Sequence, residues 1–267
     1  MKSLTSKIGI VIIAVLIIAA LFAPWIAPHS PGEYHLDKSF AGSSLEYPLG
    51  NDADGRDILS RIIYGTRVSL GIGLVVVSIS LVIGCIVGMA AGYSGGYLDK
   101  IFSFISDVFL AFPGFLFAVA VAAFLEPSVI NVMIILSIKG WVSFARLVRG
   151  QTLAIKEREF IVAGRATGLK LPRLFFKHLF PNMVGPIVVN ASFGMAGVIM
   201  IESSLSFLGL GVPVTTPSWG VMLDQGTKYL LIAPHLSIYP GIAIALVVLG
   251  FNFLGDGLRD MLAPKNR

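Results

Sequence analysis

The chain has 267 residues, of which 55% are hydrophobic and only 13% are charged, and its mean hydropathy is +0.85. Soluble domains carry about 25% charged residues, so this composition excludes an ordinary soluble fold and favours a membrane protein. The net charge of +5 would suggest a nucleic-acid partner in a soluble protein, but in a membrane protein basic residues mark cytoplasmic loops. We therefore expect no nucleic-acid partner. A single cysteine and four scattered histidines predict neither a disulfide framework nor a metal site.

Six stretches are apolar enough to form membrane-spanning helices, which need about 20 mostly apolar residues. In chain order they are residues 8–26, 68–92, 101–124, 129–148, 183–210 and 236–254. The first could instead be a cleaved signal peptide. It is long for one, however, and no clean small-x-small site follows, so we expect an uncleaved helix. The predicted fold is an all-α, polytopic membrane bundle of about six helices.

The distribution of charge predicts the orientation of this bundle. From Arg146 to Lys177 there are eight basic residues but only two acidic ones, Glu157 and Glu159. The positive-inside rule places this stretch in the cytoplasm. Alternation of the spans then places both termini inside and the loop 27–67 outside.

This orientation divides the chain into two expected units. One is an N-terminal helix with an extracytoplasmic loop, residues 1–67. The other is a five-helix core, residues 68–267, which contains a cytoplasmic loop at 151–181.

Three glycines in the second span, Gly84, Gly88 and Gly92, repeat every four residues and so line one helix face. Small residues at this spacing let membrane helices approach closely. We interpret this face as a packing surface inside the bundle or at a subunit interface. The alternative is a flexible helix that tolerates glycine.

Three ionisable residues fall inside predicted spans, where each is a functional candidate. Asp107 and Lys139 lie at similar depths on adjacent helices, so one hypothesis pairs them. The alternative leaves Asp107 solvated separately and Lys139 snorkelling or facing a wet pathway. Glu202 is expected near the outer face, either as an interfacial acid in water or as a polar lock near an outer gate.

The charged stretch 151–181 is predicted to form two helices joined by a rigid corner, and we call this segment the elbow. We expect a helix over 151–167 that ends at Gly168, a position suited to a left-handed residue, with Leu169 as the customary apolar contact. Pro172 suits the first turn of a second helix, which should end at Phe180, before Pro181. Such an elbow either lies on anionic lipid through its bases or docks onto a soluble partner.

The sequence contains no motif for nucleotide hydrolysis. It lacks G-x-x-x-x-G-K-[ST], H-E-x-x-H and C-x-x-C, and it shows no convincing pair of nucleophile and base. We therefore expect no enzyme activity in this chain.

Several motifs resemble those of one transporter family. The charged loop resembles the EAA loop of ABC importer permeases, through Ala163 in "IVAGRATG", Gly168 and Pro181. Other stretches resemble the C-type permease of the dipeptide, oligopeptide and nickel branch, over about residues 1–265: "YPLGNDADGRDILSRIIYGTRVSLG", "FLAFPGFLFA", "GWVSFARLVRGQTL", "IESSLSFLGLGVPVTTPSWGVML" and "GDGLRDMLAPK". The chain departs from the family where Val162-Ala163-Gly164 replaces Glu-Ala-Ala. Glu157 and Glu159 stand nearby but are not equivalent to the missing carboxylate.

The resemblance implies a type I importer permease fold and a coupling helix that seats in a cleft of a separate ATPase subunit. The coupling-loop residues would be Glu157, Glu159, Ala163, Gly164, Arg165, Gly168 and Pro181. Arg165 would face an acid on the ATPase if Ala163 and Ala166 turn inward.

The resemblance also implies partners and a location. The partners would be a related permease subunit, two ATPase subunits, an extracytoplasmic solute-binding protein and membrane lipid. The chain would bind no cofactor itself, because ATP and Mg would sit on the ATPase subunits. It would be a multi-pass protein of a prokaryotic inner membrane, and the imported solute would be a short peptide. The alternatives are nickel or another small solute and, from a different class, a secondary transporter with inverted repeats and paired intramembrane charges.

Overall fold

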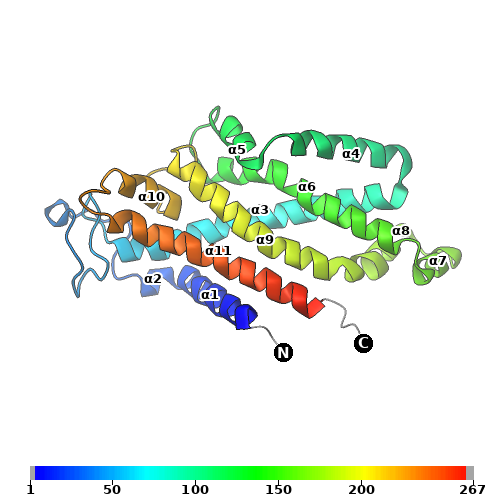
Figure 1. Ribbon diagram of the computed structural model, residues 1–267, viewed down its shortest axis with the longest axis horizontal. Helices are drawn as coiled ribbons and strands as arrows, with labels where there is room; N and C mark the ends of the chain where they lie inside the picture. The colour runs from blue at the N-terminus through cyan, green and yellow to red at the C-terminus, as the bar shows by residue number, and fades with distance from the viewer. Residues whose placement is uncertain (1–3, 263–267) are drawn as a thin grey trace.

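The computed structural model describes residues 4–262, most of which lie in helices (Figure 1). In chain order the elements are α1 (Leu4–Leu21), α2 (Ala23–Ile26), η1 (Leu36–Lys38), α3 (Ile58–Ser94), α4 (Gly96–Ala111), α5 (Gly114–Ala122), α6 (Val129–Ile155), α7 (Glu159–Ala166), α8 (Leu171–Leu174), η2 (Phe175–Leu179), α9 (Phe180–Phe207), α10 (Trp219–Thr227) and α11 (His235–Leu262). The β-type pairing among the described residues is one isolated bridge, between Asn51 and Asp57. The predicted all-α class is confirmed.

Five helical stretches are each long and apolar enough to cross a membrane. They are α1, α3, α6, the run from α8 through α9, and α11. Helices α4 and α5 meet the same criterion only as a pair, and they are bent by 79° at the break between them. Counting this pair as one span gives the six expected spans.

The bend corrects the prediction of a continuous helix over 101–124. It falls at Phe112 and Pro113, between α4 and α5. Phe112 has φ −95° and ψ 131°, the extended conformation that a following proline imposes by steric clash. Pro113 then precedes α5, where its carbonyl accepts the Phe117 N–H at 3.0 Å. The third span is therefore two short helices joined at a proline.

Helix α3 begins ten residues earlier than the predicted start at 68. Asp57 caps it, because its carboxylate accepts the Ser60 N–H at 3.0 Å. Arg61 and Arg67 interrupt the apolar pattern here and hid this start from sequence reasoning. The expected boundary at residue 67 therefore falls inside α3.

The most extensive contact between helices joins α3 to α6. The glycine face of α3 lies in this contact: a Cβ on Gly88 would sit 2.4 Å from the carbonyl oxygen of Ala145, and one on Gly84 would sit 2.4 Å from Phe144 Cβ. Gly92 approaches the carbonyl oxygen of Arg149 in the same way. The two backbones thus lie too close for any side chain larger than hydrogen on this face.

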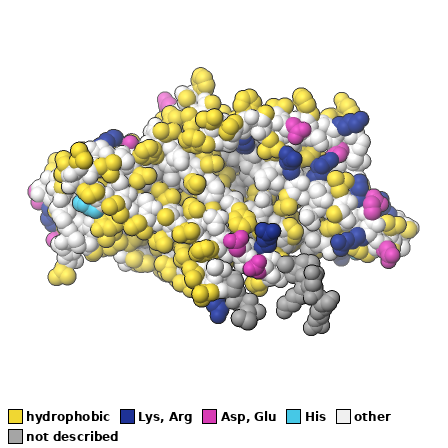
Figure 2. Space-filling model, viewed as in Figure 1, with side chains coloured by type: hydrophobic (Ala, Val, Ile, Leu, Met, Phe, Trp, Pro, Cys, Tyr) yellow, Lys and Arg dark blue, Asp and Glu magenta, His cyan; other side chains and the backbone are white. Residues whose placement is uncertain are grey.

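The helices form an elongated bundle in which α3 runs through the middle (Figure 1). Helices α1 and α11 lie along one side and α4 along the other, while α9 packs between α3 and α11. Helix α7 lies at one end, and the segment 27–57 lies with α10 at the opposite end. Figure 2 shows hydrophobic side chains over most of one face, with charged side chains gathered toward the α7 end. This distribution suits a bundle surrounded by lipid and apolar partners.

The orientation of this bundle can be tested with single cysteines. Ser43, in the segment 27–57, and Thr167, which directly follows α7, are both exposed, while the native Cys85 is buried. We expect a cysteine at Ser43 to react with an impermeant thiol reagent in intact cells, and one at Thr167 to react only after lysis. The unmodified chain serves as the control for labelling of Cys85. The reverse pattern would contradict the six-span orientation.

Candidate functional site

The elbow, residues 151–181, forms the end of the molecule opposite α10 (Figure 1). The prediction of one helix over 151–167 is wrong, because α6 ends at Ile155 and α7 begins at Glu159. The turn between them brings Ile155 and Ile161 into one buried cluster. On a single straight helix, two residues six positions apart point about 120° away from each other. The core, rather than a helix-breaking residue, therefore sets this turn.

The corner after α7 has the geometry of a Schellman motif. Gly168 has φ +76°, which confirms the predicted left-handed residue. Its N–H donates to the Arg165 carbonyl, and the Leu169 N–H donates to the Gly164 carbonyl, both at 3.0 Å. Leu169 also packs over Gly164, where a Cβ would lie 3.0 Å from Leu169 Cδ1. The direction of the chain after α7 is thus fixed by local hydrogen bonds.

The second half of the elbow does not end before Pro181, as the sequence predicted. Pro172 does occupy the first turn of α8, but the helix continues through η2 into α9. The η2 turn is π-helical, and Pro181 follows it in the first turn of α9. A proline clashes with the carbonyl four residues before it, and a wide turn there relieves the clash. The elbow therefore joins α9 without a loop.

Helix α7 presents an apolar and small-residue face away from the bundle. Ile161 and Gly164 are buried, whereas Phe160, Val162, Ala163 and Ala166 are exposed. Glu157 and Glu159 are also exposed. The stated condition for an exposed Arg165, that Ala163 and Ala166 turn inward, is therefore not met, because the packing of Ile161 and Gly164 turns those alanines outward.

Arg165 folds back toward the bundle. Its guanidinium lies 5.3 Å from the centre of the Tyr93 ring and donates to the carbonyl of Lys156. The side chain is nevertheless exposed, as predicted, and its pairing with an acid on a partner stays a prediction. Its contacts within the chain hold α7 against the end of α3 and the turn after α6.

Two further contacts support the elbow from α3 and α4. Lys156 Nζ donates to the carbonyl of Gly92 at 3.1 Å, and the Arg149 guanidinium makes two hydrogen bonds to Asp99, of which Nη2 to Oδ2 measures 2.7 Å. A bidentate pair of this kind fixes orientation as well as distance. Lys156 thereby ties the base of the elbow to α3, and Arg149 ties α6, which leads into the elbow, to α4.

A cavity of about 390 Å³ lies between α3, α5, α6 and α9, and Lys139 lines it. Lys139 Nζ donates to the carbonyl of Phe112 at the bend between α4 and α5. The hypothesised pair of Asp107 with Lys139 is not formed. Asp107 lies 4.0 Å from Arg146 instead, and both of these side chains are mostly exposed. The bend after α4 explains this, because it brings a backbone carbonyl to Lys139.

Glu202 is fully buried near the C-terminal end of α9, so the interpretation as an interfacial acid in water is wrong. Its carboxyl accepts hydrogen bonds from Ser206 Oγ at 2.9 Å and from Ser69 Oγ of α3 at 3.1 Å. Ser206 Oγ in turn accepts the N–H of Val212 at 3.1 Å. The cluster therefore links α3, α9 and the loop after α9.

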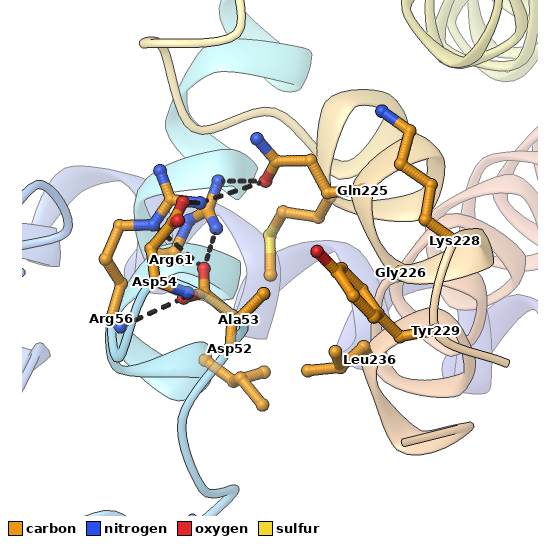
Figure 3. Close-up of a pocket in the computed structure, with 12 residues that line it drawn as sticks. Asp52, Ala53, Asp54, Arg56, Arg61, Gln225, Gly226, Lys228, Tyr229 and Leu236 are labelled. Atoms are coloured by element: carbon orange, nitrogen blue, oxygen red, sulfur yellow. Dashed lines mark hydrogen bonds and ion pairs between the residues drawn. The ribbon is translucent and has the colours of Figure 1, made fainter. Parts of the chain in front are cut away.

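A buried ionic network at the α10 end of the bundle was not anticipated from the sequence (Figure 3). Asp52 accepts hydrogen bonds from Arg56 Nε at 2.9 Å and from Arg61 Nη1. Both arginines also donate to Gln225 Oε1 of α10, at 3.2 Å and 2.9 Å. The alternation of acidic and basic residues in "NDADGRDILSR" was a signal for ion pairs within this segment. The contact with Gln225 could not be found in this way, because Gln225 is far away in the sequence. This network fastens residues 52–61 to α10.

The fold and these features define the class of protein: a multi-pass membrane bundle with an ordered elbow at one end and an ordered cap, residues 27–57 with α10, at the other. Residues 80–267 match the family described as binding-protein-dependent transport system inner membrane component. Residues 4–43 match the N-terminal TM domain of oligopeptide transport permease C.

Relatives extend the match over nearly the whole chain. The dipeptide transport system permease protein of Alkalihalophilus pseudofirmus is 42% identical over 264 residues, which cover 99% of this chain and 87% of that protein. The glutathione transport system permease proteins of Pectobacterium atrosepticum and Escherichia coli O157:H7 are 42% and 43% identical over 254 residues, 95% of this chain and 84% of each relative. The chain belongs to the inner-membrane permease family of ABC importers, and it is an integral inner-membrane protein.

Proposed function

We propose that this chain forms half of the pathway of an ATP-driven importer for short peptides. The observation that carries the proposal is the elbow, a short helix held at a fixed angle by the Gly168 corner and presented at the end of the bundle. The names of the relatives, which refer to dipeptides and glutathione, support a short peptide as the solute. Both solutes carry amide bonds and a free carboxylate.

The coupling contact in this proposal is the outward face of α7. Phe160, Val162 and Ala163 are exposed there and would fit an apolar cleft on an ATPase subunit. The elbow is then stiff for a mechanical reason: closure of the ATPases must move α6 and α9, and both continue directly from it. ATP and Mg would bind to the ATPase subunits rather than to this chain.

Besides the ATPase contact, the complete importer would contain three further kinds of contact. A related permease subunit would cover the apolar surface along α5 and the residues that flank it, where Phe112, Leu116 and Phe124 are exposed. An extracytoplasmic binding protein would deliver the solute at the end formed by residues 27–57 and α10. Two ATPase subunits would occupy the opposite end, and lipid would surround the bundle.

Import by the reconstituted complex tests this function. The chain would be purified with its permease partner, ATPases and binding protein, and placed in proteoliposomes with ATP inside or outside as orientation requires. We expect ATP-dependent uptake of a labelled dipeptide that stops when the binding protein is omitted. Uptake of glutathione or nickel but not of a dipeptide would change the assigned solute. Uptake driven by an ion gradient without ATP would contradict the importer class.

A further inference from the structure

The cavity beside Lys139 has the composition of a solute-binding site. Its lining is mostly apolar and aromatic, with Phe117, Phe144 and Phe193 among the larger side chains. A few polar groups interrupt this lining, namely Ser80, Ser143 and Asn190, and Lys139 is the one charged residue on it. Pockets that bind small molecules typically combine an apolar wall with a few placed polar groups.

Lys139 has no carboxylate partner among the described residues, since no acidic oxygen there lies within 4.0 Å of its Nζ. An ammonium group carries three N–H donors, and the one hydrogen bond recorded for Nζ goes to the Phe112 carbonyl. The Phe117 ring lies 5.8 Å away and adds a weak cation–π contact. A charge at this depth is costly without a countercharge, and such residues usually mark a binding site or pathway.

Lys139 is partly buried, and its position along α6 places it within the span rather than at either end of the helix. It lies ten residues after Val129 and sixteen before Ile155, which corresponds to about 15 Å and 24 Å along the helix. Its partner carbonyl belongs to Phe112, at the bend between α4 and α5. A group that binds Lys139 there would therefore contact both the cavity and the bent span.

We propose that Lys139 binds a carboxylate group of the imported solute inside the pathway. The inference rests on the proposed function and adds a residue that selects the chemistry of the solute. A carboxylate is a stronger partner for an ammonium than a neutral carbonyl, because the hydrogen bond is charge-assisted on both sides. Every linear peptide with a free C-terminus carries this group, whatever its side chains. The aromatic wall of the cavity would accommodate the rest of the solute without selecting its sequence.

Three substitutions separate this role from the contact with Phe112. Lys139→Arg keeps the charge, Lys139→Gln keeps a donor for the Phe112 carbonyl but loses the charge, and Lys139→Met loses both. Each variant would be purified in the full complex, and dipeptide uptake and co-purification of the partner subunits would be measured. We expect Lys139→Arg to keep most uptake. We expect Lys139→Gln and Lys139→Met to lower it about tenfold or more, as for loss of a hydrogen bond to a charged group.

Lys100→Met, at an exposed position near the start of α4, is the matched control and should leave uptake at the unmodified level. Normal uptake by Lys139→Gln would overturn the inference and assign Lys139 to the Phe112 carbonyl. Loss of the second permease from the Lys139→Met complex would also overturn it and point to an acid on that subunit. If the unmodified complex takes up the dipeptide and all three variants match it, only this inference fails. If the unmodified complex takes up no peptide, the proposed function fails with it.

Discussion

Replacing Gly168 by Val is expected to uncouple the complex from its ATPase while leaving the bundle folded. Gly168 has φ +76°, and an L-residue pays roughly 1–2 kcal/mol or more for this conformation. A penalty of about 1.4 kcal/mol lowers the equilibrium constant for forming the native corner about tenfold. We expect ATP hydrolysis stimulated by loaded binding protein, and co-purification of the ATPase, to fall by up to about that factor.

The matched control is Gly150→Val in α6. A Cβ at Gly150 meets no atom within 4 Å, as at Gly168, but Gly150 does not have a positive φ. The two variants therefore differ in backbone strain rather than in available space. Equal activity of the two, both at the unmodified level, would refute the role of the corner in coupling.

The same assay identifies which face of α7 touches the partner. Val162 is 47% exposed on the outward face, so Val162→Asp should weaken ATPase binding by placing a charge in an apolar contact. Arg165→Glu should act differently, because Arg165 contacts Tyr93 and the Lys156 carbonyl within the chain. Its effect should depend little on salt, whereas an ion pair with the ATPase would weaken with salt. If the elbow instead lies on lipid, ATPase binding should survive all of these changes.

Replacing Gly88 by Val is expected to cause the largest loss of folded protein. A Cβ there would lie 2.4 Å from the backbone oxygen of Ala145, so α3 and α6 must separate to admit it. Overpacking typically costs about 1–3 kcal/mol when side chains can adjust. Here the opposing atom belongs to the backbone, and we expect at least that cost. Yield of monodisperse protein in detergent and its thermal midpoint would measure the effect.

Gly71→Val is the matched control on the same helix, because a Cβ at Gly71 meets no atom within 4 Å. We expect it to retain the yield and midpoint of the unmodified chain. If glycine served only to keep α3 flexible, both variants would behave alike. A difference confined to Gly88 would support close packing as the reason for glycine at this position.

Local features of the sequence determined the number of spans and the corner at Gly168. Long apolar runs identify helices in lipid because each backbone group must be paired within its own segment. The position of Gly168, followed by Leu169 and Pro172, indicated the helix end because the motif depends on neighbouring residues alone. These predictions needed no knowledge of how the helices pack.

Other features depended on contacts between residues far apart in the chain. The start of α3 was missed because Arg61 breaks the apolar pattern, and its charge is tolerated only because Asp52 and Gln225 meet it. The turn between α6 and α7 was missed because burial of Ile155 and Ile161 together produces it.

The charges within predicted spans also show which properties are local in sequence and which depend on the tertiary structure. The sequence by itself marked Asp107, Lys139 and Glu202 as charges within predicted spans, because hydrophobic context is a local property. Only the tertiary structure assigned their partners: Arg146 to Asp107, the Phe112 carbonyl to Lys139, and serine hydroxyls to Glu202. Residue spacing along a helix gives the depth of a side chain in the span. Which side chains meet depends on the rotation of each helix about its axis and on the bend at Pro113. The rotation and the bend depend in turn on the packing of the whole bundle.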